Sequence, residues 1–403
     1  MAQHYSPEEV SGAVLATELA EDMMRRGNQV TIVTCAPNYP LGKVYGGYKN
    51  KLRFIEIINH VRVVRVWSYI TSSKRNWKRV VNYGTFSLSA FYGGIIAGKP
   101  DVIFSYSPPL PLGLSAWLLS RLWKVSWILR VEDLYPDAAI AAGVLRNNQL
   151  ISMLKALESF IYRKSSHISL ISEGFRRNLV EKGVEPDKLA VTPLWSDQNA
   201  IFPQEKENNF KAALGLSNQF VILYAGNLGL TSSLEDVLHS ANILKDNPGI
   251  HYMLVGEGLK KEALIQYAND HHLNQVHFLP YQPRTILSEM LAVADISLVT
   301  LNPASSGYSM PNKIYNIMAS GRPVIVIAPR ESDLAQLVQL AECGICVPPD
   351  SPHIIAETIL SLMNNPILLD ELGNNGRAYL EKHFSRQRCM DEYESLLKRV
   401  ALC

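Results

Sequence analysis

Three turns in the second half of the chain have the composition of an anion-binding site. The turns at 226–229 (GNLG) and 256–258 (GEG) and the loop at 304–313 (ASSGYSMPNK) each follow a strand-like apolar run. Backbone N–H groups at such turns are expected to point at a bound anion, and a following helix favours negative charge at its start. Lys313 falls in the first turn of the next predicted helix, where a cation opposes the helix dipole. A bound diphosphate would explain this lysine; the alternative is a solvated lysine.

Familiar motifs of other enzyme classes are missing from the sequence. It has no G-x-x-x-x-G-K-[ST] and no G-x-G-x-x-G after a strand, the nearest string being GEGLK at 256–260. This argues against a P-loop and weakens a hydride-transfer interpretation. The lack of G-x-S-x-G argues against a serine hydrolase, and the lack of Asp-x-Asp removes the usual metal-chelating pair of single-domain sugar transferases.

Strand-like and helix-like segments alternate through nearly the whole chain. Strands are predicted at 29–34, 61–66, 101–105, 125–131, 167–172, 188–193, 219–225, 250–256, 275–279, 295–300, 323–327 and 344–347. Helices are predicted at 12–26, 76–97, 149–163, 174–182, 233–245, 258–269, 284–293, 312–319, 332–341 and 352–364, with two or three more in 366–400. Strands separated by helices predict parallel sheets with right-handed crossovers.

The length of 403 residues predicts two domains, and the 47% hydrophobic content predicts large cores. Residues 193–218 interrupt the alternation with prolines and a polar run, and we interpret them as a hinge. The predicted fold class is therefore α/β, with two Rossmann-like doubly wound domains that face a cleft. Ligands of such sheets bind beyond the carboxyl ends of the strands, so the cleft is the expected site.

Charge is divided unevenly between the two halves. Residues 1–195 have 24 Lys and Arg against 15 Asp and Glu, whereas residues 196–403 have 15 against 22. The two halves therefore face different partners, or each other.

The amino terminus is unusual for a Rossmann-like domain, which normally begins with a strand. Residues 1–10 do not have a strand pattern. We expect either that the domain lacks its first strand or that the natural start lies upstream. No signal peptide and no apolar run of about 18 residues is found.

The five cysteines are scattered and odd in number, which predicts reduced thiols in a cytoplasmic protein. Cys343 and Cys346 form a single C-x-x-C. A metal or redox role is one interpretation, and small buried residues at a strand edge are the favoured one.

Together, these segments resemble the family 4 retaining glycosyltransferases, in the branch that makes bacterial surface polysaccharides and includes fucosamine and colanic-acid transferases. The resemblance in the second half rests on VILYAGNLGL (221–230), LVGEG (254–258), HFLPYQP (277–283), ADISLV (294–299), PASSGYSMPNKIYNIMASGRPVIVI (303–327) and CGICVPP (343–349). In the first half it rests on SPEEVSGAVLATELAEDM (6–23), CAPNYPLGKVYGGY (35–48), YSPPLPLG (106–113) and VEDLYPDAAIAAGVL (131–145). Each motif alone is weak, but the ordered set covers nearly the whole chain.

The resemblance implies a GT-B fold and metal-independent transfer of a sugar from a UDP- or GDP-linked donor, with retention of configuration. It implies an acceptor-binding domain at 1–196, a donor-binding domain at 197–385, and a carboxyl-terminal helix at 386–403 that packs on the first domain. The implied donor-binding residues are Gly12, Gly226, Asn227, Gly229, Gly256, Gly258, Tyr281, Arg284, Tyr308, Ser309, Asn312, Lys313 and Asn316. No metal or other cofactor is expected, so helix ends and basic side chains must meet the diphosphate charge.

Four positions depart from the pattern of the family. Its members often have two glutamates eight residues apart that contact the sugar and the ribose, where this chain has Tyr308 and Asn316. They also often have an Arg and a Lys near the diphosphate, where this chain has Asn227 and Ser232. Lys313 and Arg284 are the predicted substitutes for the two missing cations.

In the first half the resemblance assigns Gly12, Glu132 and Asp133 to the site. Gly12 is predicted in the loop before the first helix, where only glycine lets the backbone approach the donor phosphates; the alternative is an ordinary helix-start glycine. Glu132 and Asp133 follow a strand, where carboxylates hold sugar hydroxyls or accept the acceptor's proton. We favour Asp133 as the key catalytic residue, against a helix cap or a salt bridge between domains.

Two basic and aromatic clusters in the first half favour an anionic lipid surface. They consist of Lys74, Arg75, Trp77, Lys78 and Arg79, and of Arg121, Trp123, Lys124 and Trp127. The alternative is a solvated basic face with core tryptophans. Peripheral contact with the inner membrane would fit a polyprenyl-linked acceptor, and nothing favours nucleic acid.

The leading hypothesis is therefore a cytoplasmic glycosyltransferase of surface polysaccharide synthesis that acts on a glycan or lipid-linked acceptor. The alternatives are a non-catalytic relative that binds a nucleotide-sugar or a partner enzyme, and a UDP-sugar 2-epimerase.

Overall fold

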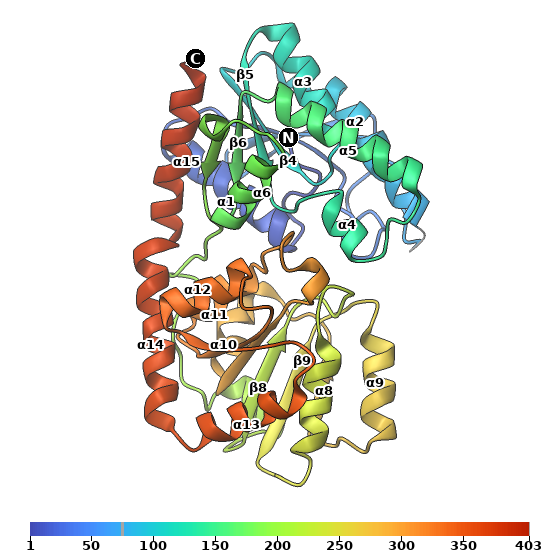
Figure 1. The fold of residues 1–403 in the computed structure, drawn as a ribbon. Coiled ribbons are helices and arrows are strands. Elements are labelled where there is room, and N and C mark those ends of the chain that lie inside the picture. Colours follow the sequence, from blue (N-terminus) through green and yellow to red (C-terminus); the bar gives the residue numbers. More distant parts are fainter. Residues whose placement is uncertain (74–75, 403) are drawn as a thin grey trace. The chain divides into compact units, whose positions relative to one another are not determined.

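The computed structural model describes residues 1–73 and 76–402, which form two compact units (Figure 1). The first unit contains Met1–Pro193 and Cys389–Cys403, and the second contains Leu194–Arg388. The chain passes from one unit to the other after Pro193 and again after Arg388, compared with predicted boundaries at 196 and 385.

The first unit contains two sheets with helices packed on them. Its strands are β1 (Thr31–Cys35), β2 (Arg53–Ile58), β3 (Val61–Val66), β4 (Val102–Ser107), β5 (Ser126–Val131), β6 (His167–Leu170) and β7 (Leu189–Val191). Its helices are α1 (Ser11–Arg25), α2 (Asn76–Ala97), α3 (Leu112–Trp123), α4 (Asp137–Ala141), α5 (Asn148–Lys164) and α6 (Glu173–Glu181). The strand orders are β1-β3-β2 and β4-β5-β6-β7.

The predicted strands and helices of this unit are confirmed, but β2, α3 and α4 were not predicted. Strand β2 is antiparallel to β3, so the expectation of purely parallel sheets is wrong here. The cause is the connection between them: Asn59 and His60 both have positive φ, 48° and 69°. This two-residue left-handed turn makes a tight hairpin instead of a crossover.

Residues 1–10 form no strand, as predicted, yet Met1 and Ala2 connect the two sheets. The amino group of Met1 donates to the carbonyl of Phe104 in β4 at 2.6 Å, and the Ala2 N–H donates to Val33 in β1 at 3.1 Å. Burial lowers the pKa of this amino group to about 5. The segment therefore lies between β1 and β4 and hydrogen-bonds to both.

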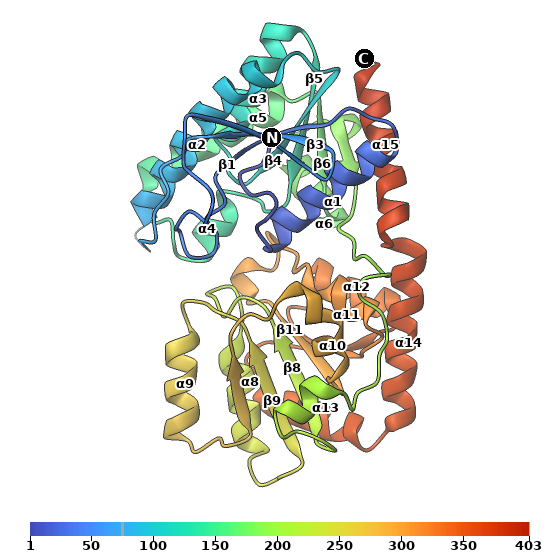
Figure 2. The same ribbon diagram turned by 180° about the vertical axis from the view of Figure 1, so that it is seen from behind.

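The second unit is one doubly wound, fully parallel sheet of order β10-β9-β8-β11-β12-β13 (Figure 2). Its strands are β8 (Phe220–Ala225), β9 (Ile250–Val255), β10 (Val276–Leu279), β11 (Ile296–Thr300), β12 (Val324–Ile327) and β13 (Gly344–Val347). Its α-helices are α7 (Asn209–Ala213), α8 (Leu234–Ile243), α9 (Lys261–Asp270), α10 (Leu287–Ala292), α11 (Lys313–Ala319), α12 (Asp333–Ala341), α13 (Pro352–Met363) and α14 (Pro366–His383).

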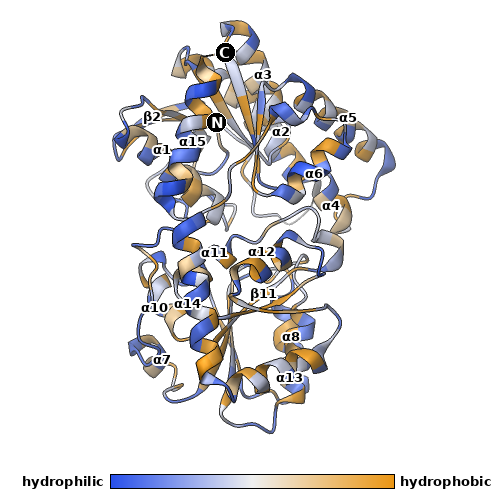
Figure 3. Ribbon diagram, turned by 60° about the vertical axis from the view of Figure 1, so that its left-hand side comes forward, coloured by the Kyte–Doolittle hydropathy of each residue, from blue (hydrophilic) through white to orange (hydrophobic). Residues whose placement is uncertain are grey.

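This unit agrees closely with the sequence. Only α7 was not predicted, and the helix predicted at 284–293 is divided into a 3₁₀ turn at Arg284–Ile286 and α10. All five residues of β11 are buried, and the strand is drawn mainly in orange in Figure 3. A strand covered by helices on both faces needs such a continuous apolar run.

The last helix, α15 (Arg386–Ala401), lies mostly in the first unit. Its Leu396 and Val400 are buried with Ile128 of β5. On the same face, the ring of Tyr393 lies 5.4 Å from the guanidinium carbon of the buried Arg130. Helix α15 therefore completes the core of the first unit on that side of the sheet.

Candidate functional site

The strand order of the second unit changes direction between β8 and β11. From β8 the chain proceeds to β9 and β10 on one side, and then returns to β11 on the other. Loops on either side of such a switch point separate and leave room for a ligand. Here Asn302, after β11, donates from its backbone N–H to Thr231 at 2.9 Å and from its side chain to Leu230 at 2.8 Å. These bonds fix the loop after β11 against the far end of the loop after β8.

Lys313, the first residue of α11, lies at this switch point. Its Nζ atom is 3.6 Å from the centre of the buried Tyr224 ring at the end of β8. A Cβ atom at Gly226 would lie 2.5 Å from the same Nζ. Glycine at 226 therefore leaves the space that the ammonium group occupies. Because α11 has seven residues, the lysine rather than a long helix dipole supplies the positive charge here.

The glycine turns after β8 and β9 pack directly on each other. A Cβ at Gly256 would lie 1.9 Å from the carbonyl oxygen of Gly226, and one at Gly258 would lie 2.1 Å from that of Leu228. The N–H of Gly226 donates to Val255, and that of Gly256 donates to Leu279. The expectation that these two N–H groups point at an anion is therefore wrong, because the backbone of the neighbouring strand takes both.

Two of the positions that depart from the family pattern are hydrogen-bonded. The hydroxyl of Ser232 lies 3.0 Å from the hydroxyl of Tyr224, and the side-chain oxygen of Asn316 accepts from Ser196 at 2.9 Å. A small cavity of about 50 Å³ lies beside Asn316 and Lys313. The amide of Asn316 is thus held in a fixed orientation at the edge of the switch point.

The other predicted donor-binding residues lie on loops at the same end of the sheet. Tyr281 follows β10 and is 44% exposed, and Arg284 begins the adjacent 3₁₀ turn. Tyr308, Ser309 and Asn312 lie between β11 and α11. A Cβ at Gly229 would lie 2.6 Å from the amide nitrogen of Asn227, so these two residues pack together in the loop after β8.

In the first unit, Gly12 lies next to Glu132. A Cβ at Gly12 would be 3.6 Å from a carboxylate oxygen of Glu132. The prediction that Gly12 precedes the first helix is wrong: α1 begins at Ser11, and the Val14 N–H already donates to Val10. The start of α1 therefore faces the carboxylate that follows β5.

Glu132 is half-buried, and one cation lies near its carboxylate. Its Oε1 lies 3.9 Å from Nε of Arg130, and its side chain is 22% exposed. Burial raises the pKa of Glu132 from an ordinary value of 4.5 to about 7; Asp133 raises it further, and Arg130 opposes the rise. A carboxyl group of this pKa exchanges a proton near neutral pH, as an acid or base catalyst must.

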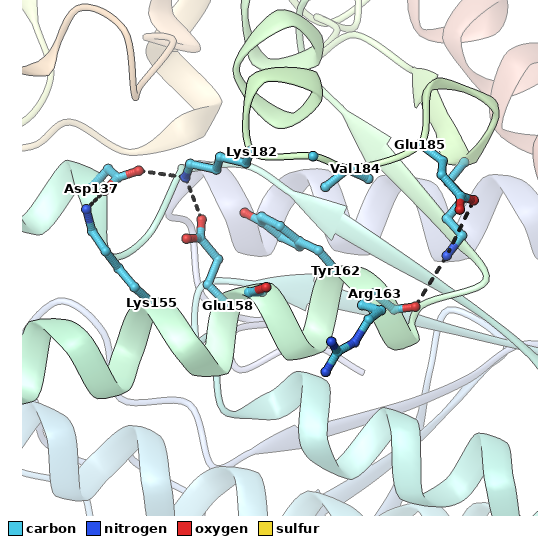
Figure 4. A pocket seen from close by; sticks show the side chains of 11 residues that line it. Asp137, Lys155, Glu158, Tyr162, Arg163, Lys182, Val184 and Glu185 are labelled. Carbon is cyan, nitrogen blue, oxygen red and sulfur yellow. Dashed lines mark hydrogen bonds and ion pairs between the residues drawn. The ribbon is translucent and has the colours of Figure 1, made fainter.

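The helix after these carboxylates is held by a partly buried ion-pair network (Figure 4). Lys182 lies 2.6 Å from Asp137, the first residue of α4, and 2.7 Å from Glu158 of α5. Lys155 also reaches Asp137, at 3.6 Å. These residues line a pocket of about 460 Å³. The network fixes the start of α4, four residues after Asp133.

Glu8 is a site-organising residue that sequence reasoning did not single out. Its Oε1 accepts from the N–H groups of Asn38 and Tyr39 at 2.8 and 2.7 Å, and its Oε2 lies 3.0 Å from the ring of His4. Although burial opposes it, these hydrogen bonds hold the pKa of Glu8 below its ordinary value. Glu8 thereby fixes the start of the loop at 38–52. The only signal in the sequence was the pair Glu8-Glu9 shortly before a helix, which is too common to be specific.

The basic and aromatic clusters are partly described. Lys74 and Arg75 lie outside the described residues. Trp77 is 57% exposed, with Nζ of Lys78 5.7 Å from its ring, whereas Trp127 is fully buried. Trp77 is therefore accessible to a partner, whereas Trp127 belongs to the core and cannot contact a lipid surface.

Three further features concern metals, thiols and membranes. Within residues 1–73 and 76–402, no group of three or more His, Cys, Asp or Glu side chains is arranged to hold a metal ion. Cys343 is buried, Cys346 is half-buried, and both are free thiols. In the same part of the chain no helix has the length and apolarity needed to cross a bilayer.

Two family models match successive parts of the sequence. Residues 12–195 match the model "Glycosyl transferase 4-like domain", and residues 205–379 match "Glycosyl transferases group 1". The first match begins at Gly12 and the second includes Lys313. The candidate residues of each unit therefore lie within a matched region.

Comparisons over most of the chain also find glycosyltransferases. The chain is 26% identical over 400 residues, 97% of each chain, to the putative colanic acid biosynthesis glycosyl transferase WcaI of Escherichia coli K12. It is 23% identical over 304 residues, 75% of each chain, to the probable glycosyltransferase WbjE of Pseudomonas aeruginosa. Its fold is similar to that of Anabaena HepE in complex with UDP-glucose, with a TM-score of 0.74, 15% identity, and coverage of 99% of this chain and 98% of that one.

Proposed function

The chain belongs to the group 1 glycosyl transferases and has their GT-B fold, and from this premise we propose that it transfers a sugar from a nucleotide-sugar during assembly of a bacterial surface polysaccharide. The colanic acid biosynthesis in the name of WcaI supports the polysaccharide, the name of WbjE supports sugar transfer, and the UDP-glucose held by HepE supports a nucleotide-sugar donor. The donor is UDP- or GDP-linked, and the acceptor is a glycan or a lipid-linked sugar.

The observation that carries the proposal is the environment of Lys313. In the described part of the chain no carboxylate forms an ion pair with its ammonium group, although that group packs on a buried ring at the switch point of the sheet. A cation held in such a place without a counter-charge favours an anionic ligand. In this proposal Lys313 binds the diphosphate of the donor and stabilises the charge that develops on it as the sugar leaves.

The other residues take roles according to their positions. Asn316, oriented by Ser196, hydrogen-bonds the ribose or the sugar, and Arg284 is a second candidate for the diphosphate. Asp133 and Glu132 orient the acceptor hydroxyl and receive its proton. The bond from the anomeric carbon to the diphosphate breaks, and the acceptor oxygen attacks the same face, so configuration is retained without a metal ion.

We further propose a polyprenyl-linked acceptor, presented at the cytoplasmic face of the inner membrane. The exposed Trp77 and its neighbouring cations motivate this choice. A lipid-linked acceptor keeps a growing glycan at the bilayer surface, so an enzyme that binds that surface gains in effective acceptor concentration.

A donor panel tests the function. Purified protein is incubated with UDP- and GDP-linked hexoses and aminosugars, with and without polyprenyl-diphosphate-linked sugar, and transfer and nucleotide release are measured by mass spectrometry. We expect acceptor-dependent transfer from one donor class, and loss of that transfer in Lys313→Met. Absence of transfer and of nucleotide release with every donor would overturn the proposal.

A second candidate is a non-catalytic relative that binds a nucleotide-sugar. It is motivated by two positions. Ser232 stands where family members often have a lysine, and its hydroxyl is hydrogen-bonded to Tyr224. Tyr308 stands where they often have a glutamate. Calorimetric binding of UDP or GDP without turnover on any acceptor would favour it.

A further inference from the structure

Helices α2 and α3 of the first unit expose an unusual number of large apolar side chains. Leu88 is 77% exposed and Leu122 is 57% exposed, values typical of charged residues. The set, which we call the α2–α3 face, consists of Trp77, Val80, Val81, Leu88, Tyr92, Ile95, Leu118 and Leu122. Within α2 the members at 77, 81, 88, 92 and 95 follow a helical repeat, so they form one stripe.

The two helices lie side by side, which makes the face continuous. A Cβ at Gly94 of α2 would lie 2.3 Å from a methyl group of Leu119 in α3, and Ser115 of α3 donates to the carbonyl of Ser87 in α2 at 2.5 Å. Each helix also has a separate buried side, with Phe86 and Ala116 fully covered. The exposed stripe is therefore an additional apolar surface, beyond what the core of the unit requires.

The charged residues on and next to these two helices are almost all basic. Between Glu56 and Glu132 the sequence contains a single acidic residue, Asp101. Over the same stretch the exposed or half-buried cations on or next to these helices are Lys78, Arg79, Lys99, Arg121 and Lys124. A partner that matches this surface must offer apolar material and negative charge together.

We propose that the α2–α3 face binds the surface of an anionic lipid bilayer. The apolar side chains enter the boundary between headgroups and acyl chains, and the five cations contact lipid phosphates. A second copy of the chain would fit poorly, because a symmetric contact would bring like charges together. A nucleic acid would leave Leu88, Leu122 and Ile95 against a polar backbone.

This inference rests on the membrane contact in the proposed function and adds which surface makes that contact. Its test does not require sugar transfer. The protein is sedimented with vesicles of phosphatidylglycerol and phosphatidylethanolamine, and with neutral phosphatidylcholine vesicles. We expect binding to the anionic vesicles that weakens as salt rises, and little binding to the neutral ones.

Variants locate the surface. Leu88→Glu and Leu122→Glu should each weaken vesicle binding by about tenfold, and Arg121→Glu by about fivefold or more. Leu340→Glu is the matched control, since Leu340 is 69% exposed in the second unit and should have no effect. Circular dichroism and turnover with a soluble acceptor check that each variant remains folded.

Three results would overturn the assignment. Vesicle binding that Leu88→Glu and Leu122→Glu leave unchanged would place membrane contact elsewhere. Equal binding to anionic and neutral vesicles would remove the role of the cations. A dimer in light scattering that Leu88→Glu converts to a monomer would show that a second copy covers the face. Failure of sugar transfer alone would affect the proposed function and leave this surface untouched.

Discussion

The Nζ atom of Lys313 lies 3.6 Å from the centre of the Tyr224 ring, above a buried side chain at the end of β8. The hydroxyl of the same tyrosine donates to the carbonyl of Asn227 at 2.8 Å and lies 3.0 Å from the hydroxyl of Ser232. The face of the Tyr224 ring therefore contacts a cation, and its hydroxyl hydrogen-bonds the loop that follows β8. The lysine comes from α11, after β11, so this contact joins the two elements of the switch point.

Replacing Lys313 should reduce transfer far more than it reduces stability. Lys313→Met keeps the apolar stem on Tyr224 and removes the charge that would meet the diphosphate. We expect kcat/KM for the donor to fall by roughly 100-fold, with a partial recovery in Lys313→Arg. Lys245→Met, an exposed lysine of the same unit, is the control and should be neutral. Equal activity of Lys313→Met and the control would remove Lys313 from the site.

The glycine turns after β8 and β9 should tolerate no side chain. In Gly256→Ala the new methyl group would overlap the carbonyl oxygen of Gly226, 1.9 Å away, so the two loops must separate. We expect a loss of at least about 2 kcal/mol in stability, measured by calorimetry, together with weaker nucleotide binding. Gly249→Ala is the matched control, because the nearest atom to its new Cβ is 3.9 Å away. Comparable melting temperatures for the two variants would contradict this close packing of the two turns.

The parallel strands of both units could be predicted from the sequence because each is a short apolar run between helical segments. Strand β2 could not, since its pattern is half exposed and its pairing depends on the left-handed turn at Asn59 and His60. The position of Lys313 was predictable from the loop and helix around it. Its contact with Tyr224 was not, because the two residues are far apart in the chain and meet only through the strand order.

In the first unit, too, contacts between residues far apart in the chain could not be predicted from the sequence. Glu132 was identifiable as a carboxylate at a strand end, but its raised pKa depends on burial, which Arg130 only partly opposes. Glu8 was missed because its partners, Asn38 and Tyr39, belong to a loop without a periodic pattern. Residues that act through contacts between distant segments leave no local signal.

The stability of the protein should depend on the charge of Glu132. Its pKa rises from 4.5 to about 7 on folding, chiefly through burial, so the folded state binds more protons than the unfolded state between these values. Stability contributed by this group is therefore lost as pH rises from about 4.5 to about 7. Glu132→Gln, which stays neutral, should melt higher relative to wild type at pH 8 than at pH 5.

The control for this prediction is Glu181→Gln, on an exposed position of α6. Its melting temperature should follow wild type at both pH values. If Glu132→Gln also followed wild type throughout, the carboxyl group of Glu132 would not be perturbed on folding. A wild-type transfer rate that falls below about pH 7, with the fall absent in Glu132→Gln, would in addition connect this carboxyl group to proton transfer.

The two lysines that contact Asp137 should differ sharply in their effect on stability. Lys182 is 25% exposed and pairs also with Glu158, whose side chain is 6% exposed, so Lys182→Met leaves a buried carboxylate without its partner. We expect the free energy of unfolding to fall by about 2 kcal/mol. This is less than for a fully buried pair, because Lys182 is partly exposed to solvent. Lys155 is 54% exposed and 3.6 Å from Asp137, and Lys155→Met should cost less than about 0.5 kcal/mol.

Urea unfolding, monitored by tryptophan fluorescence, measures the difference in stability between the two lysine variants in the first unit. Every tryptophan except Trp195 belongs to the first unit. Adding Glu158→Gln to Lys182→Met should restore part of the loss, because an amide is less costly to bury than an unpaired carboxylate. Equal losses for the two lysine variants, or no recovery in the double variant, would show that the network does not hold α4 in place behind Asp133.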